Sequence, residues 1–146
     1  MPLDITDPDA VADAAKKADD VNLLVNNAGI GGAALLGDID DVRVAMDVNF
    51  WGTLSMIRAF APVLARNGGG AILNIAYSAS WFVFPGGSAQ GPSKAAVRSI
   101  SDELRRELAG QRTLVTSVHP GAADTATTNG SHVPGTAPRR YRARRA

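Results

Sequence analysis

Three short apolar runs, each separated from the next by a long amphipathic segment, are the feature that most constrains the fold of this chain. The runs cover residues 21–26, 71–76 and 113–118, and the segments between them have apolar residues at near-helical spacing over 41–66 and 93–109. Short apolar runs that alternate with amphipathic helices are typical of strand–helix units in a parallel sheet. The sequence therefore predicts an α/β fold, with helices on both faces of a parallel sheet.

A further helix is predicted near the start of the chain, because its first residues suit a helix N-terminus. Asp7 can accept hydrogen bonds from the free amides of the first turn, and Pro8 fits the first helical position. Asp9 opposes the positive end of the helix dipole. We expect this helix to run to Lys17.

The composition limits the classes of function. The chain has 146 residues, which is one domain's worth, and a net charge of +1, so no general field attracts nucleic acid or a membrane surface. It has no cysteine, and its two histidines, His119 and His132, are too scattered for a metal cluster. No apolar run reaches the roughly 18 residues of a membrane span. We expect a soluble, cytoplasmic protein with no metal, nucleic acid or membrane partner.

The character of the sequence changes after Asp124. Small and polar residues dominate there, and five arginines lie within the last eight residues. Nothing in this segment has the period of a helix or a strand. The sequence therefore predicts one folded domain over residues 1–125 and a disordered basic tail over 126–146. An electrostatic role for the tail is a weaker hypothesis, since no aromatic platform or folded basic face accompanies it.

Three groups of residues in this pattern are candidates for a role in binding or catalysis. The motif Asn-Asn-Ala-Gly at 26–29 follows the first apolar run, where parallel sheets bind ligands, although the same residues suit a plain turn. Asn49 lies among apolar neighbours, which indicates either a local distortion of the helix or an ordinary surface asparagine. Lys94 lies at the start of a helix, where its charge opposes the dipole. It is either a functional cation that lowers a neighbour's pKa or an ordinary solvated lysine.

In this order and spacing, these features resemble the short-chain dehydrogenase/reductase family. The motif at 26–29 is similar to the family's sheet-stabilising motif, Asn49 to the asparagine of its catalytic tetrad, and Lys94 to the lysine that ends its Tyr-x-x-x-Lys motif. The resemblance covers about residues 2–125 and implies a partial Rossmann-like, doubly wound parallel sheet of three strands plus the remnant of a fourth. It also implies hydride transfer between NAD or NADP and an alcohol or carbonyl substrate.

The resemblance also assigns contacts to the cofactor. Asp4 and Ile5 are similar to the family's adenine pocket, and the segment at 120–125 is similar to the loop that contacts the nicotinamide carboxamide. The cofactor-binding residues expected on this basis are Asp4, Ile5, Asn26, Ala28, Gly29, Lys94, Pro120, Gly121 and Thr125.

Two positions depart from the family's catalytic pattern. Gln90 stands four residues before Lys94, where the family has its catalytic tyrosine, and Tyr77 falls where the family has the serine that orients the substrate. A glutamine amide can donate a hydrogen bond to a carbonyl but cannot deliver the proton that hydride transfer requires. The expected catalytic residues are therefore Asn49, Lys94, Tyr77 and Gln90, in an impaired site. That Tyr77 supplies the missing phenol is a weaker hypothesis.

The front of the family's fold has no counterpart before Asp4. The family begins with a glycine-rich strand, turn and helix that bind the pyrophosphate, and its first strand lies beside the strand predicted here at 21–26. Without that neighbour the strand has a bare apolar edge, open to pairing with another chain. The helices at 41–66 and 93–109 correspond to those that the family uses for dimers, so we expect a homo-oligomer.

Two hypotheses for function follow from the sequence. In the first, the chain is a truncated, catalytically impaired NAD(P)-dependent short-chain oxidoreductase. In the second, it is a non-catalytic paralogue or gene fragment of the same fold that acts, if at all, through association. The residue that discriminates them is Gln90.

Overall fold

The computed structural model describes residues 2–31, 34–83 and 88–121. The elements follow in the order helix α1 (Pro8–Lys17), strand β1 (Leu23–Asn26), helix α2 (Ile39–Met46), the π-helical stretch η1 (Asp47–Gly52), helix α3 (Thr53–Arg66), strand β2 (Gly70–Ile75), the short turn η2 (Ser78–Ser80), helix α4 (Gln90–Glu107), the short turn η3 (Ala109–Gln111) and strand β3 (Thr113–Val118). In this described part, no helix is long and apolar enough to cross a lipid bilayer. The tail predicted at 126–146 lies outside the described residues.

Helix α1 begins as its local sequence predicts. The Asp7 side chain accepts hydrogen bonds from the backbone amides of Asp9 and Ala10, at 2.9 and 3.1 Å. Pro8 occupies the first turn, and the helix ends at Lys17. These capping contacts involve only neighbours in the chain, so the predicted bounds of this helix are confirmed.

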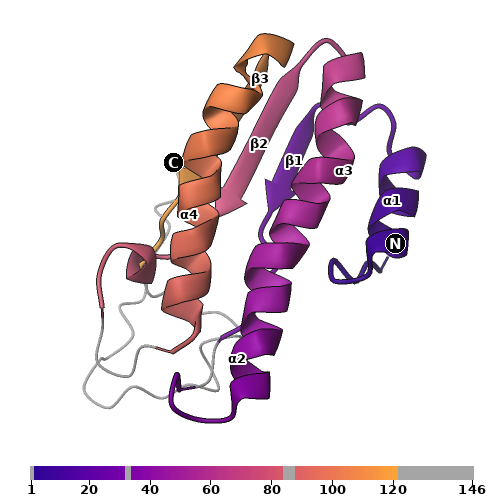
Figure 1. Cartoon of the computed structure of the whole chain (residues 1–146). Helices are drawn as coiled ribbons and strands as arrows, with labels where there is room; N and C mark the ends of the chain where they lie inside the picture. Colours follow the sequence, from indigo (N-terminus) through magenta and orange to yellow (C-terminus); the bar gives the residue numbers. More distant parts are fainter. Residues whose placement is uncertain (1, 32–33, 84–87, 122–146) are drawn as a thin grey trace, which may run out of the picture.

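The three strands form one parallel sheet in the order β1-β2-β3. Leu24 of β1 pairs with Ile72 of β2, and Ile72 in turn pairs with Val115 of β3. Figure 1 shows α3 and α4 lying along the strands, with α1 beside α3. The predicted α/β class and the parallel sheet are confirmed.

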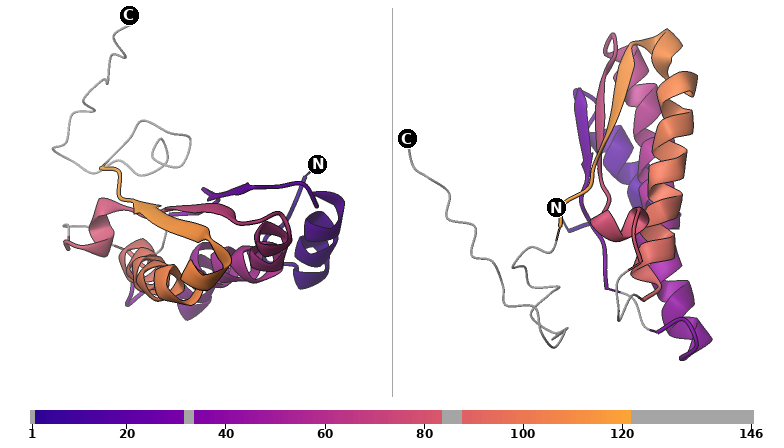
Figure 2. Two further views of the ribbon diagram at one scale, coloured as in Figure 1. Left: turned by 90° about the horizontal axis from the view of Figure 1, so that it is seen from above. Right: turned by 90° about the vertical axis from the view of Figure 1, so that its left-hand side faces the viewer.

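The helices lie on one face of the sheet, so the prediction of helices on both faces is wrong for the described residues. Figure 2 shows α1, α3 and α4 on the same side of the strands. Because β1, β2 and β3 are successive both in the chain and in the sheet, the two crossovers run in the same direction. Right-handed crossovers then put α3 and α4 on the same face. The expected remnant of a fourth strand is also not formed, since residues 2–7 are an irregular segment with one turn.

The core fills the space between the sheet and α3. Leu24, Ile72 and Val115 point from the three strands toward the helices and are 6, 1 and 4% exposed. Ile57 and Leu64 of α3 meet them at 1 and 0% exposure. Burial of an aliphatic side chain of this size stabilises a fold by about 1.5–3 kcal/mol, so this single layer of contacts fixes α3 on the strands.

The other face of the sheet presents apolar side chains to solvent. Successive side chains of a strand point to opposite faces, so Leu23, Val25, Leu114 and Val118 lie on the side away from the helices. Their exposed fractions are 52, 48, 73 and 43%. We call these four residues the open sheet face. No helix from the described part of the chain covers it.

Candidate active site

A ladder of buried amides joins the carboxyl ends of β1 and β2 to helix α4. The Asn26 amide donates to the Asn74 side-chain oxygen at 2.8 Å, and the Asn74 amide donates to the Ser101 hydroxyl at 2.9 Å. Ser101 donates in turn to the Val97 carbonyl of the same helix at 2.7 Å. Asn74 and Ser101 are fully buried. Asn26, the first residue of the motif at 26–29, therefore ties the end of β1 to the end of β2.

Asn49 lies in the π-helical stretch η1, so the predicted distortion of the long helix at this residue is confirmed. Its side chain accepts from the Ile30 amide at 2.8 Å and donates to the Ile30 carbonyl at 3.0 Å. It also donates to the Ser93 hydroxyl at 3.0 Å. The Asn49 carbonyl accepts from the Thr53 hydroxyl at 2.8 Å. Asn49 thus fixes the loop after β1 against the first turn of α4.

Lys94 is nearly enclosed, with 5% of its surface exposed. Its ammonium donates to the Ile75 carbonyl, at the end of β2, over 2.9 Å. Burial lowers the pKa of Lys94 from its ordinary value of 10.5, because a charged amine loses hydration there. This excludes the interpretation of Lys94 as an ordinary solvated lysine.

Gly29 is the point at which Asn49 and Lys94 come together. A side-chain carbon added at Gly29 would lie 3.0 Å from Asn49 Oδ1 and 3.1 Å from Lys94 Nζ. The three residues come from the loop after β1, from η1 and from α4, so only the folded chain brings them together. Their cluster lies beyond the carboxyl ends of the strands, which is where parallel sheets bind ligands.

The two residues that depart from the expected catalytic pattern flank this cluster. Gln90 is the first residue of α4, one helical turn before Lys94, and its carbonyl accepts from the Ser93 hydroxyl at 2.9 Å. Tyr77 follows the end of β2 and directly precedes η2, which packs against α4. Both side chains are half-buried. Residues four apart on a helix share a face, so Gln90 and Lys94 point to the same side of α4.

The expected cofactor contacts lie along the same end of the sheet. The Asp4 carboxylate accepts from the Thr6 amide and hydroxyl at 2.9 and 2.7 Å, and the hydroxyl contact in particular lowers the pKa of Asp4. Ile5 packs on Gly52 of η1, where an added side-chain carbon would lie 2.7 Å from its terminal methyl.

The remaining expected contacts fall at the ends of β1 and β3. Ala28 is exposed beyond β1, whereas Asn26 is buried in the amide ladder. The Pro120 carbonyl accepts from the Ser78 amide at 3.0 Å, which ties the segment at 120–121 to η2. Gly121 is exposed, and Thr125 lies outside the described residues. The cofactor roles of all these residues stay predictions.

Several residues that shape this region are not identified by the sequence analysis. Asn74 and Ser101 complete the amide ladder, and the signal for Asn74 is a polar residue within an otherwise apolar strand. Trp81 and His119 contact each other, with the indole nitrogen 3.2 Å from Nδ1 of the histidine, although they are 38 residues apart. Nothing local in the sequence indicates that contact.

The stability of the fold should depend on pH through Lys94. Because burial lowers its pKa in the folded state, the unfolded chain binds this proton more tightly. The free energy of unfolding should therefore rise as the pH increases from the lowered pKa toward 10.5. In Lys94→Met this rise should be smaller, as measured by urea unfolding at about pH 8 and about pH 10.

The control for this measurement is Lys16→Met. Lys16 is on the surface of α1, where its side chain is 75% exposed and pairs with Asp13 at 2.9 Å. This variant should keep the pH dependence of the unmutated chain. If the stability of Lys94→Met depends on pH as strongly as that of the unmutated chain, Lys94 is not the cause of the pH dependence.

The parallel sheet, with polar residues that converge beyond its strand ends, makes this an α/β protein with a candidate ligand site at that edge. Residues 1–133 match the family model described as short chain dehydrogenase. The chain therefore belongs to the short-chain dehydrogenase/reductase family, and the resemblance found in its motifs is confirmed.

Relatives and solved structures agree with this assignment. The chain is 35% identical over 129 residues to an uncharacterized oxidoreductase of Staphylococcus saprophyticus, covering 84% of this chain and 55% of the relative. It is 36% identical over 132 residues to the NADPH-dependent 1-acyldihydroxyacetone phosphate reductase of Schizosaccharomyces pombe, covering 86% and 44%. The crystal structure of a short chain dehydrogenase from Burkholderia cenocepacia in complex with NADP matches with a TM-score of 0.83 at 40% identity, over 92% of this chain and 60% of that one. The chain thus spans about half the length of these proteins.

Proposed function

We propose that this chain carries the active-site part of an NAD(P)-dependent oxidoreductase, an enzyme that transfers hydride between the cofactor and an alcohol or carbonyl. The observation that carries the proposal is the cluster of Gly29, Asn49 and Lys94 beyond the strand ends, with an enclosed lysine at its centre. Further support comes from the Burkholderia cenocepacia relative, whose structure contains NADP.

The residues present suit a nicotinamide cofactor. A lysine ammonium has three donors, and one of those of Lys94 binds the Ile75 carbonyl. As far as the described residues show, two donors are then left for hydroxyl groups, such as those of a ribose. Gly29 has no side chain, so the space 3.1 Å from Lys94 Nζ that a side-chain carbon would take is left free. When bound, the cofactor would supply or accept the hydride. Asn49 would act by holding the Ile30 loop and α4 in place.

The proton step of such a reaction is expected to be slow in this chain. A carbonyl that receives a hydride also needs a proton on its oxygen, and a positioned acid contributes about 10²–10⁴-fold to the rate of such steps. Gln90, one turn before Lys94, has no titratable proton to give, and Tyr77, which precedes η2, takes by resemblance the place of the family's substrate-orienting serine. We therefore propose that the site binds cofactor and is catalytically impaired.

The alternative is a non-catalytic chain that acts through association, and the open sheet face favours it. Four exposed apolar residues on one surface are typical of a surface that another molecule covers. Under either alternative we propose a homo-oligomer in the cytoplasm. The lack of cysteine in the sequence supports that location.

Cofactor binding by the full chain tests the proposal. Titration with NADPH or NADH should shift the amide resonances of Gly29 and Lys94 in a two-dimensional NMR spectrum. Lys94→Met should weaken that binding by about 10–100-fold, because hydrogen bonds to a charged group are worth about 1.5–3 kcal/mol. Lys16→Met, on the surface of α1, should bind as the unmutated chain does.

A spectrum that stays unchanged when either cofactor is added in large molar excess would contradict the proposal. If the chain then also associates with rising concentration in sedimentation velocity, the alternative is supported. Leu114→Lys, which puts a charge on the most exposed residue of the open sheet face, should in that case reduce the association.

A further inference from the structure

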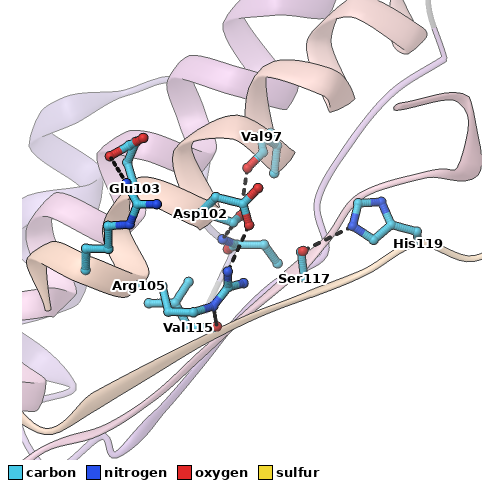
Figure 3. Close-up of polar contacts among 10 residues, drawn as sticks. Val97, Asp102, Glu103, Arg105, Val115, Ser117 and His119 are labelled. Carbon is cyan, nitrogen blue, oxygen red and sulfur yellow. Dashed lines mark hydrogen bonds and ion pairs between the residues drawn. The ribbon is translucent and has the colours of Figure 1, made fainter. Parts of the chain in front are cut away.

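A cluster of side chains outside the cofactor site joins the end of β3 to the segment after β2. His119 lies just beyond β3, and its Nδ1 is 2.9 Å from the Ser80 hydroxyl and 3.2 Å from the indole nitrogen of Trp81. Its Nε2 is 3.1 Å from the Ser117 hydroxyl. Figure 3 shows the imidazole ring of His119 next to Ser117. One ring thus contacts three partners from both segments.

The chemistry of these partners fixes the proton on the imidazole. An indole nitrogen can only donate a hydrogen bond, so Nδ1 of His119 must accept from Trp81 and carries no proton. In the neutral ring the proton is then on Nε2, which donates to the Ser117 hydroxyl. The Ser80 hydroxyl, which rotates freely, can also donate to Nδ1. The observed contacts therefore fit the neutral Nε2–H tautomer.

Within the described part of the chain, the charged groups around this cluster are mainly cations. The Arg98 guanidinium of α4 lies 4.1 Å from the centre of a Trp81 ring, a cation–π contact. One turn to either side on α4 are Lys94 and Asp102, and Asp102 pairs with Arg105 at 2.9 Å. Strands β2 and β3 and turn η2 contain no ionisable side chain, and the phenol of Tyr77 lies between β2 and η2. A second positive charge on His119 would adjoin the Trp81–Arg98 pair.

The cluster borders the segments that flank the site. Trp81 follows η2 directly, and the first amide of η2, that of Ser78, donates to the Pro120 carbonyl at 3.0 Å. Tyr77 directly precedes the same turn. Whatever holds Trp81 on His119 therefore also holds η2 against the segment that follows β3.

We propose that His119 is a pH-sensitive positioning residue. In its neutral form it accepts a hydrogen bond from the Trp81 indole N–H and fixes η2 next to Tyr77 and Pro120. When His119 is protonated, Nδ1 carries a proton that faces the indole N–H, so this hydrogen bond is lost and Trp81 is released. The proposal goes beyond the proposed function and does not depend on it.

Tryptophan fluorescence of the full chain tests this inference. The chain has two tryptophans, so in the Trp51→Phe background Trp81 is the sole emitter. Its emission should change in a single one-proton transition as the pH is lowered, because protonation of the imidazole ends the hydrogen bond from the indole. His132→Gln should keep the transition, and His119→Gln should remove it. A flat profile, or a transition that persists in His119→Gln, would overturn the inference.

Histidine nitrogen NMR provides a second measurement on the unmutated chain, which does not rely on any variant folding. In its neutral form the His119 ring should show a protonated Nε2 and an unprotonated Nδ1, and the indole N–H signal of Trp81 should shift as the pH falls. A neutral ring that carries its proton on Nδ1, or one with no tautomer preference, would refute the proposal.

Discussion

Replacing Gly69 by alanine is expected to lower the free energy of unfolding by about 3 kcal/mol, whereas the same replacement at Gly68 should cost about 1 kcal/mol. Both glycines follow the end of α3 and have positive φ angles, 86° at Gly68 and 112° at Gly69. Each alanine would therefore bear conformational strain, because an L residue disfavours this region. The difference between the two comes from the surroundings of the added methyl group.

At Gly68 the added carbon would meet nothing within 4 Å, but at Gly69 it would overlap the Arg112 carbonyl and lie 2.8 Å from the Arg112 side chain. That carbonyl also accepts the Gly70 amide at 3.1 Å, so the backbone there cannot move away without breaking the start of β2. Overpacking against a fixed neighbour costs typically about 1–3 kcal/mol in addition to the strain.

Urea unfolding, monitored by circular dichroism, measures the free energy of unfolding of the Gly68 and Gly69 variants. Gly110→Ala serves as a further control, because its added carbon also meets nothing within 4 Å and its φ is not positive. This variant should be neutral or slightly stabilising. Equal losses of stability at Gly68 and Gly69 would mean that backbone strain alone causes the loss and that the contact with Arg112 does not contribute.

The sequence predicts best the parts of this fold that neighbouring residues determine. Asp7 and Pro8 specify the start of α1 by contacts within one turn, and the predicted helix agrees with the structure at both ends. The distortion at Asn49 was likewise predictable, because a polar residue in an apolar stretch needs a partner for its amide. The identity of that partner, Ile30, was not, since it lies 19 residues away.

The contacts that the sequence did not predict depend on how segments distant in the chain pack together. The amide ladder needs the register that sets Asn26 opposite Asn74, and the Trp81–His119 contact needs the ends of β2 and β3 side by side. The placement of the helices is different, because the right-handed crossover rule would have put α3 and α4 on one face once the strand order was known. The error was to apply the two-sided cover that is usual for parallel sheets to three strands that follow one another in both the chain and the sheet.

The catalytic defect attributed to Gln90 and Tyr77 has a direct chemical remedy. Gln90 and Lys94 share one face of α4, so a phenol at position 90 would lie beside a buried ammonium that lowers its pKa. Tyr77→Ser would remove the bulk of the phenol after β2 and leave a hydroxyl to orient a carbonyl. Because the relatives are about twice as long, the changes belong in a fusion with the part of a longer relative that this chain does not match, such as that of the Burkholderia cenocepacia protein whose structure contains NADP.

In that fusion the double variant Gln90→Tyr, Tyr77→Ser should oxidise NADPH with small ketones or aldehydes at least about 100-fold faster than the variant Gln90→Phe, Tyr77→Ser. The phenylalanine control has nearly the same shape and lacks only the hydroxyl, so the difference isolates the proton donor. The hydride would reach the carbonyl carbon, and the new phenol would protonate the oxygen. The decay of NADPH absorbance under steady-state conditions measures both rates. If the double variant binds NADPH but reduces none of the carbonyl substrates, Gln90 is not what limits this site. That result would favour the association hypothesis over the oxidoreductase hypothesis.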